Sequence, residues 1–298
     1  AEEEPEIALD MPAKMSSFLE GGWRHSAEKR RVPAGLLTEL RPYQQRGFQW
    51  LALMRDMGFG MCLADDMGLG KTVQVITLLL EQRLQQPALI VCPTSVLWNW
   101  QKELERFAPS LKVWLHHGPY RQHGDDFTAA AAKVDIVLTS YPLVMRDEAD
   151  LRQLDWSYFI LDEAQHIKNR EAKQTEAVNR LRAGADVRIA LTGTPVENRL
   201  SELWAILDFV NPGLLGELRE FQEKYIVPIE KENNQERMQQ LRTLVSPFIL
   251  RRLKTDPEIH KELPEKLEMK TYCWLTPEQV SLYQAVMDTM LQGLEGSS

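Results

Sequence analysis

The clearest chemical signal in the sequence is a glycine-containing loop that could bind a polyphosphate. It lies in LADDMGLGKTVQVI, residues 63–76, where an apolar strand ends, a loop follows, and a Lys-Thr pair opens an amphipathic helix. The loop amides and the helix N-terminus would face the anion, Lys71 would reach the terminal phosphates, and the Thr72 hydroxyl could bind Mg²⁺. Gly68 and Gly70 would let the backbone approach the phosphates without a Cβ in the way.

Two adjacent carboxylates could complete a site for phosphoryl transfer. In YFILDEAQHIKN, Asp162 and Glu163 follow a predicted strand. Such a site needs one carboxylate near Mg²⁺ and a second group that orients or deprotonates the attacking water. Asp162 suits the first role and Glu163 the second. An acidic pair after a strand usually caps a helix, but a phosphate loop in the same predicted sheet favours the catalytic interpretation, because ligands of such sheets gather at the carboxyl ends of the strands.

The elements that must position these residues alternate along the chain up to about residue 195. Because the short strands are apolar nearly throughout and helices separate them, the pattern predicts an α/β fold with a parallel sheet buried on both faces. The predicted strands are residues 60–64, 88–92, 112–116, 134–140, 158–162 and 187–193, and helical spacing marks residues 73–84 and 96–107.

Beyond residue 195 the pattern becomes helical. We expect helices in residues 201–210, 216–226 and 231–245, interrupted by NPG at 211–213 and VP at 227–228. The last segment predicts a helix with Thr276 as its N-cap, Pro277 in its first turn and Gln279 completing a capping box.

Composition narrows the function classes. The 298 residues are 44% hydrophobic and 26% charged, as in an ordinary globular protein with a large core. A net charge of −8 excludes a generally basic nucleic-acid coat but leaves room for a local basic groove. The longest apolar runs are far shorter than the roughly 20 residues of a membrane span. The acidic start, AEEEPEIALD, does not read as a signal peptide, and the lack of an initiator Met leads us to expect a processed or excised chain.

Cysteines, histidines and tryptophans favour structural roles. Cys62 and Cys92 lie in apolar runs and Cys273 is distant, so we expect core thiols and a reducing, cytosolic-type protein. Adjacent on a strand, His116 and His117 would point to opposite faces and could not easily share a metal. We expect the tryptophans that lie within apolar patterns to pack in the core or between lobes: Trp50, Trp98, Trp100, Trp156 and Trp204.

Taken together, the motifs resemble those of the Swi/Snf family of helicase-like ATPases, and specifically its prokaryotic members. The resemblance extends from about Leu40 to about Met287. Its blocks are ELRPYQQRGFQWL, LADDMGLGKT, VCPTSVLWNWQKEL, LTSYPLV, DEAQHIKN, ALTGTPVENRLSELWAIL and SPFILRRLKTDPEIHKELPEKLE. Asp65 stands where the GxxxxGK[ST] pattern has its first glycine, and acidic residues there are typical of this family.

The resemblance implies a RecA-like P-loop lobe that binds ATP and Mg²⁺. Gln44 would read the adenine edge, Lys71, Asp162 and Glu163 would be catalytic, and Thr72 and Asp162 would hold Mg²⁺. The nucleotide-binding loop would comprise Asp65, Asp66, Met67, Gly68, Leu69, Gly70, Lys71 and Thr72. The residues expected to couple the phosphate state to DNA are Gln165, Thr192, Gly193 and Thr194.

The resemblance also implies double-stranded DNA as the partner. The residues that would contact its phosphates are hydroxyl donors at strand ends, namely Thr94, Ser95, Thr139, Ser140 and Tyr141. Ordinary capping and turn chemistry accounts for them equally well. The basic run of Arg251, Arg252 and Lys254 could bind phosphate, brace the lobes or be a solvated charge run, and the sequence does not separate these.

We expect four parts: an accessory segment (1–35), the RecA-like lobe (36–195), a mainly helical protrusion (196–250), and a linker with a helix (251–298) leading toward a second RecA-like lobe. No block after Leu275 resembles the motifs of that second lobe, which supplies an arginine finger in this family. Because such an arginine accounts for about a thousandfold or more in rate, we expect feeble hydrolysis by this chain alone.

The leading hypothesis is therefore the N-terminal ATPase lobe of a double-stranded-DNA translocase that remodels an unknown protein–DNA complex, in a prokaryotic cytoplasm at the nucleoid. An RNA or single-strand helicase of the DEAD-box kind would carry DEAD and SAT, whereas DEAQ and TGT stand here. An ATP-binding scaffolding module is a further alternative. The intact Lys71, Thr72, Asp162 and Glu163 argue against a decayed site.

Overall fold

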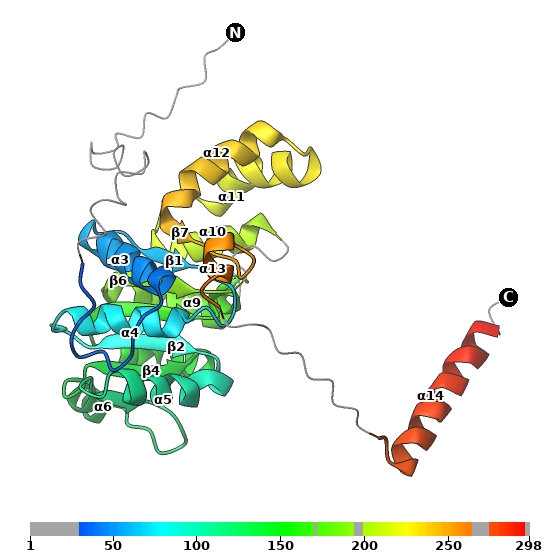
Figure 1. The fold of residues 1–298 in the computed structure, drawn as a ribbon, viewed down its shortest axis with the longest axis horizontal. Coiled ribbons are helices and arrows are strands. Elements are labelled where there is room, and N and C mark those ends of the chain that lie inside the picture. The colour runs from blue at the N-terminus through cyan, green and yellow to red at the C-terminus, as the bar shows by residue number, and fades with distance from the viewer. Residues whose placement is uncertain (1–29, 170–171, 194–198, 264–273, 296–298) are drawn as a thin grey trace, which may run out of the picture. The chain divides into compact units, whose positions relative to one another are not determined.

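The computed structural model describes residues 30–169, 172–193, 199–263 and 274–295. The chain divides into two units, Ala1–Glu262 and Leu263–Ser298. The first unit is built on one seven-stranded sheet with helices on both faces (Figure 1). The described part of the second unit contains the helix α14 (Pro277–Glu295).

All strand pairs in the sheet are parallel, in the order β3-β4-β2-β5-β6-β1-β7. The six predicted strands are confirmed, and residues 88–92 match to the residue. One strand, β7, was not predicted: it is short and pairs with β1 after the helical region. The bounds are β1 (Met61–Leu63), β2 (Ala88–Cys92), β3 (Val113–Leu115), β4 (Ile136–Ser140), β5 (Trp156–Asp162), β6 (Ala185–Leu191) and β7 (Ile249–Leu250).

The strand order determines which face of the sheet each connecting helix covers. From β1 to β3 the chain moves toward one edge of the sheet, and from β4 to β6 it moves back, so right-handed crossovers put the connecting helices on opposite faces. The helices α3 (Pro42–Asp56), α4 (Lys71–Glu81) and α5 (Leu97–Phe107) lie side by side (Figure 1). Further helices are α6 (Gly124–Ala131), α7 (Tyr141–Arg146), α8 (Glu148–Leu151) and α9 (Lys173–Leu181).

The core lies on both faces of the central strands. Every residue of β2 and β4 is buried, which explains their nearly uninterrupted apolar sequence. Cys62 and Cys92 are completely buried free thiols, as predicted, and burial raises the pKa of Cys62 to about 12. Four of the five tryptophans are buried as predicted. Trp98 is 57% exposed, which excludes a place in the core, and its packing between lobes stays a prediction.

The helical region after β6 begins with α10 (Leu200–Val210), which packs against β1 and β6. The helices α11 (Leu218–Phe221) and α12 (Gln235–Val245) extend beyond the β7 edge of the sheet (Figure 1). The prediction that VP at 227–228 interrupts a helix was wrong, because a π-helix, Gln222–Lys231, continues through Pro228. Its wider turn accommodates the proline ring, which would clash in an α-helix.

Toward the end of the chain come α13 (Pro257–His260) and then α14 in the second unit. The predicted capping box of α14 is confirmed. The Thr276 amide donates to Gln279 Oε1 over 3.0 Å, and the Gln279 amide donates to Thr276 Oγ1 over 3.3 Å. None of the helices in the described ranges combines the length and apolar composition that a bilayer span requires.

Candidate nucleotide site

The predicted phosphate loop connects β1 to α4. Gly68 and Gly70 have φ of 81° and 78°, which lie in the left-handed region that favours glycine. The helix α4 begins at Lys71, so Thr72 lies in its first turn and the loop amides precede its positive end. Lys71 Nζ donates to the carbonyl oxygens of Asp65 over 2.7 Å and Asp66 over 3.5 Å.

Asp162 ends β5, and both of its carboxylate oxygens accept hydrogen bonds. Its Oδ1 accepts the Glu163 amide over 2.9 Å, and its Oδ2 accepts the indole N–H of Trp100 over 2.8 Å. Burial raises the pKa of Asp162, and the bond from Trp100 opposes that rise. Glu163 has φ of 50°, an uncommon conformation for a non-glycine residue. Backbone strain of this kind gathers at functional sites, which supports a functional role for the pair.

A chain of hydrogen bonds joins the acidic pair to the end of β6. Gln165 Nε2 donates to Glu163 Oε2 over 2.7 Å, and the Thr192 hydroxyl donates to Gln165 Oε1 over 2.9 Å. The Thr192 amide in turn donates to the Leu63 carbonyl oxygen over 3.2 Å, beside the phosphate loop. A Cβ built on Gly193 would lie 3.2 Å from Cγ of Met67 in that loop. Thr194 lies outside the described residues.

Gln44 lies at the start of α3 and faces the phosphate loop. Its Nε2 donates to the Leu69 carbonyl oxygen over 3.2 Å, and its Oε1 accepts the Arg41 amide over 2.9 Å. A cavity of about 540 Å³ opens beside it and is lined by Gly70, Arg41, Lys102 and Arg106, among others. This volume is large enough for a nucleoside.

The residues predicted to contact DNA fall into two groups. Thr94 and Ser95 are exposed after β2. Thr139, Ser140 and Tyr141 are buried: the Thr139 hydroxyl donates to the His116 carbonyl oxygen over 3.0 Å, and the Tyr141 hydroxyl donates to the Asp162 carbonyl oxygen over 2.8 Å. Direct phosphate contacts by these side chains do not fit their burial, because the hydroxyls of Thr139 and Tyr141 already donate to backbone carbonyl oxygens.

Two residues of the site were missed by sequence reasoning. Trp100 was assigned to packing, yet it bonds Asp162. Arg252 was left undecided, yet its guanidinium binds Asp65. The helical spacing of α5 separates buried Trp100 from exposed Trp98, but nothing in the spacing reveals that a carboxylate lies opposite.

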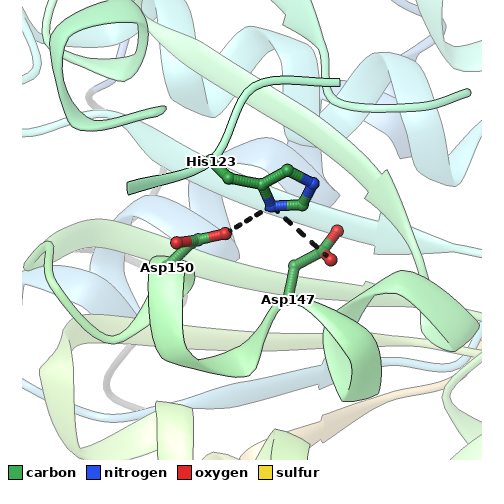
Figure 2. Close-up of side chains that lie close together, drawn as sticks. All are labelled: His123, Asp147 and Asp150. Atoms are coloured by element: carbon green, nitrogen blue, oxygen red, sulfur yellow. Dashed lines mark hydrogen bonds and ion pairs between the residues drawn. The ribbon is translucent and has the colours of Figure 1, made fainter. Parts of the chain in front are cut away.

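Away from the loop, His123, Asp147 and Asp150 bring three potential metal ligands together (Figure 2). His123 Nδ1 lies 2.7 Å from Asp150 and 4.0 Å from Asp147. Arg121 already binds both oxygens of Asp147. Because this guanidinium neutralises the carboxylate, a metal ion there would meet a resident positive charge. We interpret the group as structural.

Buried His116 completes this cluster, with Nε2 2.9 Å from Asp147. Burial lowers the pKa of His116, although Asp147 opposes the shift. For Asp147, burial favours a raised pKa, but the bonds from Arg121 and His116 outweigh it and the net shift is downward. The cluster supports the end of β4, because Thr139 bonds the His116 carbonyl.

The parallel sheet and the glycine loop between β1 and α4 define an α/β lobe of the P-loop, RecA-like class. The model of the SNF2-related domain matches residues 43–297. The chain therefore belongs to the SNF2-related family.

Individual relatives of known name are also similar to this chain. A Bacillus subtilis protein named as an ATP-dependent helicase/translocase, YwqA, is 52% identical over 88% of this chain and 29% of its own length. The TATA-binding protein-associated factor Mot1 of Schizosaccharomyces pombe is 36% identical over 93% of this chain and 15% of its own length. The chain thus spans less than a third of these relatives.

A solved structure is also similar. The Sulfolobus solfataricus SWI2/SNF2 ATPase core in complex with double-stranded DNA has a TM-score of 0.72 and 42% identity, over 90% of this chain and 56% of that one. The RecA-like architecture predicted from the sequence is confirmed by this match.

The Trp100–Asp162 bond predicts a specific cost in stability. Replacing Trp100 with Phe removes a donor from a carboxylate, and a hydrogen bond to a charged group contributes about 1.5–3 kcal/mol. The matched control is W156F, because Trp156 is equally buried but donates to a backbone carbonyl. We expect W100F to lower the free energy of unfolding in urea more than W156F, and the excess to shrink in a D162N background. Equal losses in both backgrounds would show that the contact is packing alone.

The His116 cluster predicts a pH dependence. Since the folded pKa of His116 is below its unfolded value of about 6.5, the unfolded chain takes up a proton that the folded chain refuses, and stability falls as pH drops through that range. We expect the thermal midpoint to fall between about pH 7.5 and about pH 5.5, and to fall less in H116N, whose amide can still donate to Asp147. H117N is the control and should retain the full decline; an undiminished decline in H116N would contradict the assignment.

Proposed function

We propose that this chain is the first RecA-like lobe of an ATP-driven double-stranded-DNA translocase that remodels a protein–DNA complex. The observation that carries the proposal is the continuous set of contacts from Glu163 through Gln165 and Thr192 to the phosphate loop. Such a set can make the arrangement at one strand end depend on the ligand held at another.

In the proposed site, ATP lies on the phosphate loop with its base in the cavity beside Gln44. Lys71 and the amides of residues 65–72 hold the phosphates, and Glu163 orients the attacking water. Thr72 and Asp162 supply hard oxygen ligands, which suit Mg²⁺. When bound there, Mg²⁺ would neutralise charge on the phosphates.

Within this proposal Gln165, Thr192, Gly193 and Thr194 transmit the phosphate state toward the DNA side of the lobe. Exposed Thr94 and Ser95 are the remaining candidates for phosphate contacts among the predicted hydroxyls. The similar Sulfolobus ATPase core was solved in complex with double-stranded DNA, which supports this track over RNA. Such an engine would act at the nucleoid of a prokaryotic cytoplasm.

A second RecA-like lobe is part of the proposal. The chain's partial coverage of the similar ATPase core, 56%, supports it. With a net charge of −8, this lobe would need basic residues from a partner lobe to enclose DNA. The proposed parts are the segment 1–35, the lobe 36–195, the protrusion 196–250 and the connection 251–298.

The proposed nucleic-acid partner is tested by measuring ATP turnover of the full-length protein with duplex DNA, single-stranded DNA and RNA at one salt concentration. This chain alone is the one-lobe control. We expect strong stimulation by duplex DNA in the full-length protein and little turnover by the lobe. Stimulation by RNA or single strands instead would favour a strand-separating helicase, and equal activity of the isolated lobe would refute the need for a second one.

Glu163 is tested by E163Q in the full-length protein. The amide keeps the shape but cannot accept a proton from water, so we expect turnover to fall by about a hundredfold or more, while ATP still binds. Binding of a fluorescent ATP analogue and the hydrolysis rate should be measured together. Unchanged turnover would remove Glu163 from this role, whereas lost binding would mean that it holds the nucleotide.

A further inference from the structure

The phosphate loop is bound along one side by a segment that follows the helical region. Residues 250–254, called the strap here, continue the parallel pairing of β1 and β7 beyond the ends of those strands. The Ala64 amide donates to the Leu250 carbonyl oxygen over 2.7 Å, and the Asp66 amide donates to the Arg252 carbonyl oxygen over 3.0 Å. The Lys254 amide donates to Asp66 Oδ2 over 3.0 Å.

Arg252 fixes the strap to three elements of the site at once. Its guanidinium binds both oxygens of Asp65 in the loop, Gln74 Oε1 on α4 over 2.7 Å, and the Tyr43 carbonyl oxygen on α3. It also lies over the Tyr43 ring, 5.4 Å from the centroid. A Cβ on Gly47 would overlap Gln74 and crowd Arg252, so the glycine leaves room for this arrangement.

These contacts explain why an acid replaces the first glycine of the loop pattern. The Asp65 carboxylate is completely buried and faces Arg252 and Gln74. The carbonyl of the same residue accepts the ammonium of Lys71 over 2.7 Å. The position of the phosphate-binding lysine thus depends on the backbone of a residue whose side chain is held by the strap.

Lys254 adds a second positive group beside the loop. A Cβ built on Gly68 would lie 3.5 Å from Lys254 Nζ. The strap therefore carries a largely buried guanidinium bound to the loop and the ammonium of an exposed lysine next to one of the loop glycines. If the strap only stabilised the fold, nucleotide binding would not have to alter either of these two contacts.

We propose that Arg252 is a positioning residue of the nucleotide site, which sets the shape of the phosphate loop through Asp65 and couples phosphate binding to the strap. The inference rests on the proposed ATP site. The strap belongs to the first unit, and the chain continues from it into the second unit, Leu263–Ser298. By thermodynamic linkage, ATP that tightens the loop also tightens the strap, and loosening the strap weakens ATP binding.

The first experiment compares ATP affinity among folded variants of this chain, using a fluorescent ATP analogue with Mg²⁺. R252K keeps the charge but loses the planar fork that binds Asp65 and Gln74 together. We expect roughly tenfold weaker binding or more by R252K, and wild-type affinity in R251K, whose arginine is the exposed neighbour. The thermal midpoint of each variant is measured alongside. Equal affinity of R252K and the wild type would overturn the inference.

The second experiment needs no variant. Amide hydrogen exchange of residues 250–254 is measured in the wild-type chain with and without saturating Mg·ATP. We expect slower exchange in the strap when ATP is bound, which a purely structural ion pair would not produce. No change, with ATP binding demonstrated, would overturn the coupling. Failure of the wild-type chain to bind ATP at all would instead refute the proposed nucleotide site, so the two hypotheses fail in different ways.

Discussion

Parallel pairing of β5, β6 and β1 is the constraint on which the rest of the structure depends. Because the three strands are adjacent and run the same way, their carboxyl ends meet at one edge of the sheet. The phosphate loop, the DEAQ segment and the end of β6 are distant in sequence but must converge there. The middle position of β6 allows Thr192 to bond the loop strand on one side and Gln165 on the other.

Convergence at this enclosed edge creates an electrostatic demand. A carboxylate removed from water costs several kcal/mol unless it is paired or hydrogen-bonded. The structure meets this demand differently for its two aspartates. Among the described residues, Asp65 receives a guanidinium and an amide, whereas the donors to Asp162 are neutral, from Trp100 and from the Glu163 amide. Asp162 therefore has no ion-pair partner within hydrogen-bonding distance among the described residues, which is the property that a cation ligand requires.

Local patterns made most of the fold predictable. Continuous apolar runs marked six strands, and the Thr276 capping box marked a helix start, because these signals depend on residues close in sequence. The short strand β7 and the Trp100–Asp162 and Arg252–Asp65 contacts were not predictable in this way, since each is decided by residues 62 to 187 positions apart. The hydroxyl groups of Thr139 and Tyr141 suggested phosphate contacts, but both side chains are buried and their hydroxyls donate to backbone carbonyl oxygens.

The helical region is inserted at a position that links it to the strand carrying the phosphate loop. The chain leaves the sheet after β6 and returns as β7, and these two strands pair with β1 on its two sides. The strand β1, which carries the phosphate loop, therefore lies between the strand that precedes α10–α12 and the strand that follows them. Because packed interiors transmit strain, we expect a displacement of the helical region to act on β1 through the two strands that flank it. A loop held only by its own glycines would lack this connection, and the ion pair between Asp65 and Arg252 provides it on the β7 side.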